Sequence, residues 1–204
     1  MLITSSVVIV CILIKQHYVQ IKQQIRRLDR LLTLPLKGNV TTIPEIDPQR
    51  PTAVFLIGET TGQGMHTLLS AQSMFPDHFR NFVFMSVGVV DIGSYGSDKA
   101  LKKMQASIEE RMKYFIQFSH EHGFAATSFI GYDNDPVKGL TELAETVSHQ
   151  FPNAVFFADT VISKQDNWFH RQLHSDVPMA LQHNLHLKGL QMIILPVKLD
   201  RSPA

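Results

Sequence analysis

From Thr52 onward the chain is divided by five short apolar runs. Each run is rich in β-branched or aromatic residues and is continuous rather than alternating with polar residues. Such runs are typical of strands that are covered on both faces, and strands of that kind form parallel sheets. The predicted strands are Ala53–Ile57, Phe82–Val90, Phe124–Ile130, Ala154–Ala158 and Met192–Val197.

Four longer stretches between these runs have the periodicity of helices, at residues 64–75, 97–122, 136–150 and 168–188. The second is the clearest, because its apolar residues share one face and its charged residues lie opposite. The apolar face holds Leu101, Met104, Ile108, Met112, Phe115 and Phe118, and Gly123 ends the helix. Strands and helices that alternate through right-handed crossovers predict an α/β domain with a doubly wound, five-stranded parallel sheet.

Residues 1–14, MLITSSVVIVCILI, form an apolar segment without a charge. A helix of this length rises about 21 Å, whereas a bilayer core of about 30 Å needs about 20 apolar residues. We therefore interpret the segment as the last turns of a transmembrane helix whose beginning lies outside this chain. A buried or partner-packed helix and a targeting peptide are the alternatives. The targeting peptide is disfavoured because Lys15 follows the run where a small-residue cleavage site is expected.

A heptad-like stripe continues from this segment. Its members recur at alternating spacings of four and three residues, which predicts an amphipathic helix. They are Ile14, Tyr18, Ile21, Ile25, Leu28 and Leu32. Residues 15–50 carry seven Lys or Arg against three Asp or Glu, and basic residues stay on the cytoplasmic side of membranes.

These patterns predict three parts of the chain. Residues 1–33 form a partial transmembrane and juxtamembrane amphipathic helix, residues 34–51 form a proline-containing linker, and residues 52–199 form the α/β domain. The expected location is the cell membrane, with the lipid bilayer as a partner and the α/β domain on the cytoplasmic side.

The remaining charges exclude one class of partner. Residues 51–204 hold 12 of the 19 basic and 15 of the 18 acidic residues, a net charge of −3. A mildly acidic domain binds polyanions poorly, so we expect no nucleic-acid partner. The single cysteine, Cys11, excludes an internal disulfide and a zinc site built on cysteines.

Two histidine pairs have the spacing of metal ligands on a helix, His170 with His174 and His183 with His186. A zinc site needs a third protein ligand, and although Asp166 and Asp176 are near in sequence, there is no H-E-x-x-H motif. We therefore expect no metal. Ser86 lies in a predicted strand without a nucleophile elbow, so we also expect that the chain is not an enzyme.

The loop after the first predicted strand is the main candidate binding site, because ligands of doubly wound sheets bind beyond the carboxyl ends of the strands. The segment 58–67, GETTGQGMHT, is small and hydroxyl-rich at a helix amino terminus, where backbone N–H groups can bind a phosphate or another anion. It matches neither phosphate-binding glycine motif and has no lysine, so a plain strand-to-helix turn is the alternative. The candidate ligand-binding residues are Gly58, Thr60, Thr61, Gly62, Gly64, Met65 and His66.

Several segments, taken in order, resemble one protein family. They are Ile14–Tyr18 after an apolar helix, Gly64–Leu69, Asn81–Asp91, and the tail from Trp168–His174 through Leu190–Val197. Their order and spacing resemble the carboxy-terminal part of amino-acid permease-like transporters of the amino acid-polyamine-organocation superfamily. The resemblance implies a cytosolic domain similar to the universal stress proteins, with strand order 3-2-1-4-5, attached to a transmembrane permease core.

This implied strand order places a crevice between strands one and four. It adds Asp159 and Thr160, which follow the fourth predicted strand, to the candidate ligand-binding residues. Nucleotide-binding universal stress proteins carry a glycine-rich phosphate motif at that point, whereas Asp159–Asp166 contains no glycine. We therefore expect no cofactor.

The function expected from these features is that of a membrane-tethered cytosolic regulatory or assembly domain, the carboxy-terminal part of an amino-acid permease that does not transport by itself. Its expected partners are the transmembrane permease core and, through the edge of Gln191–Val197, a second copy of the chain. Pro196 predicts that this strand lies at a sheet edge, where pairing is open. The alternative is a sensor that binds an adenine nucleotide or another anion at Gly58–His66 and Asp159–Ser163.

Overall fold

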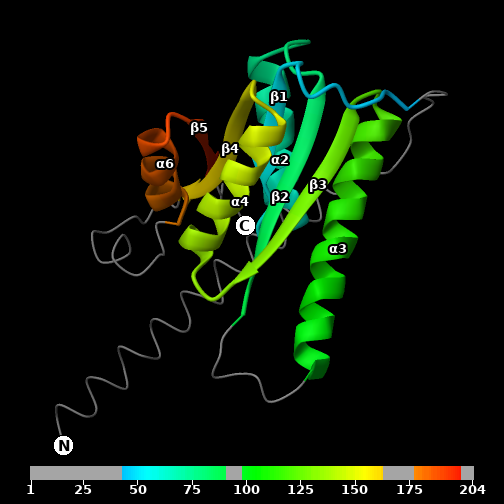
Figure 1. Ribbon diagram of the computed structural model, residues 1–204. Helices are drawn as coiled ribbons and strands as arrows, with labels where there is room; N and C mark the ends of the chain where they lie inside the picture. The colour runs from blue at the N-terminus through cyan, green and yellow to red at the C-terminus, as the bar shows by residue number, and fades with distance from the viewer. Residues whose placement is uncertain (1–42, 91–97, 163–176, 199–204) are drawn as a thin grey trace, which may run out of the picture.

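Five parallel strands form the sheet in the computed structural model, which describes residues 43–90, 98–162 and 177–198 (Figure 1). The strands are β1 (Thr52–Leu56), β2 (Asn81–Val89), β3 (Ala125–Asp133), β4 (Ala154–Ile162) and β5 (Gln191–Lys198). Their order is β3-β2-β1-β4-β5, and every neighbouring pair is parallel. The predicted α/β class, the strand number and the order 3-2-1-4-5 are confirmed, and β5 lies at the sheet edge as Pro196 indicated.

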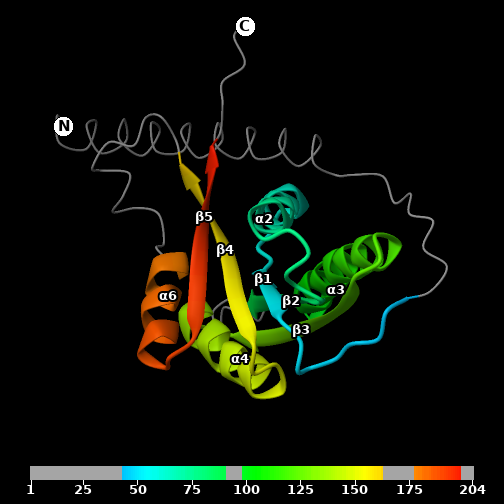
Figure 2. The same ribbon diagram turned by 90° about the horizontal axis from the view of Figure 1, so that it is seen from above.

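Helices cover both faces of the sheet (Figure 2). On one face lie α2 (Thr61–Met74) and α3 (Asp98–Glu121), and on the other lie α4 (Pro136–Gln150) and α6 (Val177–Leu187). The chain therefore winds outward from β1 in two directions. The winding reverses between β1 and β4, which makes the carboxyl ends of these two strands the expected place for a binding site.

The central strand β1 contributes to two separate cores, because successive side chains of a strand point to opposite faces. Phe55 stacks against Phe84 and Phe157 on the face covered by α2 and α3, with ring centroids 5.7 and 5.6 Å apart. Val54 and Leu56 pack on the face covered by α4 and α6. All five residues of β1 are buried, as expected for a strand that was predicted from a continuous apolar run.

Gly64 sits where α2 packs close to α3. A Cβ atom at this position would lie 2.7 Å from Cζ of Phe115 and 2.8 Å from Cδ1 of Ile57. A side chain here would therefore require Phe115 and Ile57, or the helix itself, to shift. Glycine therefore serves helix packing here, and the predicted helix start at residue 64 is three residues late.

The other predicted helices agree closely with the structure where it describes them. The predictions 97–122 and 136–150 correspond to α3 and α4, and α6 covers residues 177–187 of the predicted 168–188. Within the described ranges, no helix is both long enough and apolar enough to cross a membrane. The predicted helix over residues 1–33 lies outside the described residues.

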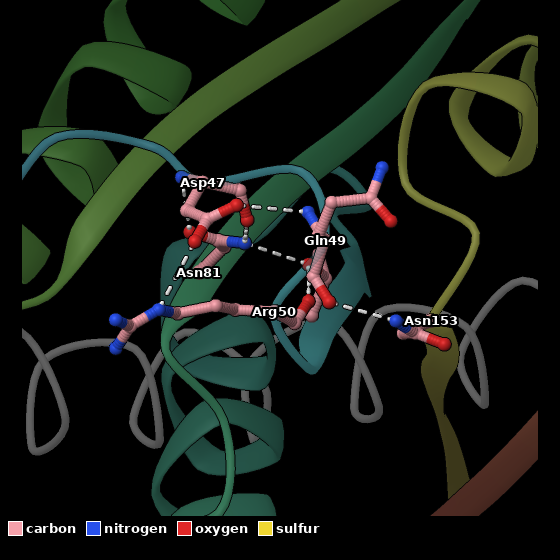
Figure 3. A network of polar contacts seen from close by, with 6 residues as sticks. Asp47, Gln49, Arg50, Asn81 and Asn153 are labelled. Carbon is pink, nitrogen blue, oxygen red and sulfur yellow. Dashed lines mark hydrogen bonds and ion pairs between the residues drawn. The ribbon is translucent and has the colours of Figure 1, made fainter.

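Part of the predicted linker is attached to the amino edge of the sheet (Figure 3). The side-chain amide of Asn81 donates to the backbone oxygen of Asp47 at 2.7 Å, and its oxygen accepts from the backbone N–H of Asp47 at 3.3 Å. Asn153 donates to the backbone oxygen of Gln49 at 2.8 Å. Arg50 pairs with the carboxylate of Asp47 at 3.1 Å. We call Asp47–Arg50, Asn81 and Asn153 the amino-edge clamp.

Candidate functional site

One half-buried acidic side chain, Asp159, lies where the carboxyl ends of β1 and β4 meet, a place that we call the crevice. Asp159 lies on β4, two residues after Phe157, and therefore points to the same face as α2. Gln63 Nε2 and Thr67 Oγ1 of α2 each lie 3.4 Å from a carboxylate oxygen of Asp159. The two donors come from positions four residues apart, which places them on one side of the helix.

Burial raises the pKa of Asp159 to about 6, and the hydrogen bond from Thr67 acts in the opposite direction. Burial dominates because the charged form loses water that two long hydrogen bonds replace only in part. Thr67 Oγ1 also lies 3.0 Å from the backbone oxygen of Gln63, and its single proton serves only one of these acceptors at a time. The Asp159 carboxyl group therefore changes charge within one pH unit or so of neutrality.

The amino terminus of α2 forms the other wall of the crevice. Thr60 is the N-cap residue, but its side chain does not cap the first turn. Its hydroxyl group instead contacts Oε1 of Gln63. A chain of polar contacts therefore runs from Thr60 through Gln63 to Asp159. These three side chains are therefore hydrogen-bonded to one another rather than to the backbone of the first turn of α2.

Two opposite charges, those of Glu59 and Arg111, interact beside the same loop. Burial lowers the pKa of Arg111 on α3, and the carboxylate of Glu59 raises it. Arg111 Nη1 donates to Oγ of Ser107 at 3.2 Å, whereas its buried Nε atom has no hydrogen-bond partner in the part of the chain that the structure describes. The positive charge of Arg111 is thus partly offset by the carboxylate of Glu59.

The predicted site residues fall into two groups in the structure. Around the crevice lie the exposed Gly58, the half-buried Thr60, Thr61 and Thr160, the buried Gly62, and Asp159. Away from it lie Gly64, which packs on α3, and Met65, which is fully buried in the core. His66 is also outside the crevice and lines a groove between α2 and β5. The sequence prediction missed Gln63 and Thr67, whose contact with Asp159 joins residues more than 90 positions apart.

No group of three or more potential metal ligands occurs among the residues that the structure describes. His183 and His186 are exposed on α6, and His170 and His174 lie outside the described residues. The prediction of no metal stays a prediction.

Comparisons with known proteins add little. No family model matches the chain, and no curated protein matches it. Among solved structures, the chain is similar to the universal stress protein from Archaeoglobus fulgidus, with 11% identity over 72% of this chain and 93% of that chain, and a TM-score of 0.45. At this TM-score we base no conclusion on the likeness. The fold class rests on the strand order of the sheet itself.

Proposed function

We propose that the chain is the carboxy-terminal part of an amino-acid permease-like transporter and acts as its membrane-tethered cytosolic regulatory or assembly domain. In this proposal residues 1–14 lie in the bilayer at the cell membrane, the basic segment follows on the cytoplasmic side, and the α/β domain does not transport by itself and is not an enzyme. The family resemblance and the order of apolar, basic and α/β segments support it.

The amino-edge clamp is the observation that carries the proposal. A simple anchor would need only a flexible connection to its domain, whereas Asp47 and Gln49 are bound to side chains at the start of β2 and just before β4. Hydrogen bonds on both sides of β1 fix the direction in which the chain approaches the sheet. A movement of the preceding segment is therefore passed to the sheet rather than lost in a linker.

Membrane attachment can be tested with charges placed in the apolar segment. Ile9→Lys combined with Ile12→Lys should move the full-length chain from the membrane fraction to the soluble fraction, because each charge in the apolar segment costs up to about 3 kcal/mol, less near the interface, and the segment is short. Ile9→Leu combined with Ile12→Leu is the matched control and should stay in membranes. Recovery of the unaltered chain in the soluble fraction without detergent would contradict the proposal.

A second candidate function, sensing of an adenine nucleotide or another small anion, is favoured by the open amino terminus of α2. No side chain caps its first turn, and nothing lies within 4 Å of the Cβ position at Gly58. The Asp159 carboxylate opposes this function above pH 6, because it places negative charge beside the anion site. Calorimetry of the full chain with ATP, AMP and inorganic phosphate at pH 5.5 and pH 8 tests it, and the absence of heat at millimolar ligand at both pH values would exclude it.

A further inference from the structure

An open groove runs along the outer side of α2 beside the edge strand β5. Its volume is about 460 Å³, and its lining comes from α2 between His66 and Met74 and from the carboxyl-terminal half of β5. The lining residues are His66, Leu69, Ser70, Ser73, Met74, Leu195 and Pro196. None of them carries a fixed charge.

One atom of this groove lacks the partner that a buried polar group requires. Nδ1 of His66 is buried and has no hydrogen-bond partner within residues 43–90, 98–162 and 177–198. A buried polar atom without a partner costs about 1–3 kcal/mol. The groove thus presents a mainly apolar surface beside this buried histidine, and an apolar groove is typical of a surface that binds another segment or protein.

The chain itself contains a segment of matching chemistry. The stripe from Ile14 to Leu32 has six apolar residues on one predicted helical face and basic residues on the others. A helix of these 19 residues is about 28 Å long, whereas the groove follows α2 for about 12 Å from His66 to Met74, so it would hold about two turns of the stripe. An apolar stripe fits a groove without charges, and the basic faces stay directed outward.

The connection to the groove is long enough. Eleven steps separate Leu32 from Ile43, the first described residue, and they can span about 36 Å when extended. This is roughly the diameter of a domain of this size. The amino-edge clamp holds the chain at the amino ends of the strands. Because α2 runs opposite to the strands, its last residue, Met74, also lies toward their amino ends, so this end of the groove is on the same side of the domain as the clamp.

We propose that the amphipathic stripe, Ile14–Leu32, docks in the α2–β5 groove of its own chain. Attachment within one chain raises the local concentration of the stripe to the millimolar range, so weak apolar contacts suffice. The docking does not require the membrane attachment proposed above. If residues 1–14 lie in the bilayer, docking also fixes the α/β domain relative to it.

Cysteine cross-linking in the full chain tests the docking. In a Cys11→Ser background, Ser73→Cys in the groove is paired in turn with Ile21→Cys, Ile25→Cys or Leu28→Cys and oxidised mildly. At least one pair should form an intramolecular disulfide ~10-fold faster than the same stripe cysteine paired with Ser107→Cys on α3, as expected for a docked contact compared with random collisions. Ser107 is the matched control, because it is also an exposed serine on a helix.

Equal rates for Ser73→Cys and Ser107→Cys, or disulfides that form only between two differently tagged copies, would overturn the proposal. A second variant, Leu69→Lys, should raise hydrogen exchange of residues 14–32, whereas Leu187→Lys on α6 should not. The membrane fraction is measured on the same samples. Cross-linking in a chain recovered in the soluble fraction would support the docking and contradict the membrane attachment. A membrane-bound chain without cross-linking would support the attachment and contradict the docking.

Discussion

The two ends of the sheet are covered by different kinds of helix. At the β3 end, α3 and α4 contain 12 charged residues, and Lys102, Glu109 and Lys113 of α3 are exposed. At the β5 end, α2 and α6 contain no Asp, Glu, Lys or Arg. Charged outer faces are normal for helices that meet water. The docking proposed above would cover part of the uncharged end.

Exposed apolar side chains occur at both ends, and at the β3 end Val89 of β2 is 48% and Tyr132 of β3 is 42% exposed. Met74 at the end of α2 is 49% exposed, and Met179 and Leu187 on α6 are 54% and 75% exposed. The predicted homodimer through β5 would use the β5 end, and so would the docking of the amino-terminal stripe. The following substitutions separate the roles of the two ends, from the largest expected effect to the smallest.

Gly64→Val should disrupt the packing of α2, at the β5 end, against α3, at the β3 end. The added side chain would overlap Phe115 of α3 and Ile57, so α2 must move away from the core. We expect a loss of about 3 kcal/mol in the free energy of unfolding, at the upper end for overpacking. Urea unfolding of the full chain in detergent measures it. Gly58→Ala is the control, since nothing lies within 4 Å of its Cβ position, and a similar loss in both variants would contradict the packing role.

Asp159→Asn should stabilise the protein, and only above about pH 4. Because its folded pKa is raised to about 6, the cost of burying the charged carboxylate is absent at low pH, grows between pH 4 and 6, and is complete above pH 6. At pH 8 the gain should reach up to about 3 kcal/mol, since one pKa unit corresponds to about 1.4 kcal/mol. Thermal unfolding at pH 4 and pH 8 measures the difference.

Asp133→Asn at the β3 end is the control, because it should lower the stability at neutral pH, whereas Asp159→Asn should raise it. The backbone N–H of Asp135 is the largest cause of the lowered pKa of Asp133, so its carboxylate stabilises the fold at neutral pH and this contribution is lost as the pH falls through the lowered pKa. A change of the same sign in Asp133→Asn and Asp159→Asn would contradict the assignment of burial as the cause at Asp159.

Helix capping gives the smallest effect. The side chain of Asp135 caps α4 by accepting from the backbone N–H groups of Val137 and Lys138 at 2.9 and 3.2 Å. Asp135→Ala should therefore cost about 1 kcal/mol. Thr60→Ala at the start of α2 should cost only a few tenths, because Thr60 does not cap its helix. Equal losses in chemical denaturation would show that the two helix starts do not differ.

The fold was predictable from the sequence because its strands are continuous apolar runs. The ends of β3 and β4 were not, since Gly131, Tyr132 and Asp133 belong to β3 through pairing with Val87–Val89 rather than through their own hydrophobicity. The early start of α2 was missed for a related reason. Gly62 and Gly64 look like turn residues, but in the structure they lie in the helix and are buried.

The candidate site was predictable only in part. Asp159 was identified from the expected position of the crevice, but its neighbours Gln63 and Thr67 depend on how α2 is rotated about its axis. That rotation is set by Met65 and Leu68, which are buried in the core. No spacing within the sequence encodes a contact between β4 and α2 across more than 90 residues. The groove beside β5 was missed because it is made by two elements that are more than 100 residues apart.

The central claim, that this chain serves a membrane transporter as its cytosolic domain, is tested most directly by purifying the full chain from membranes in mild detergent and identifying by mass spectrometry what accompanies it. The account predicts recovery of a multi-span permease that lacks a terminal domain of its own. Recovery of the chain by itself, or only as a homo-oligomer, would contradict it.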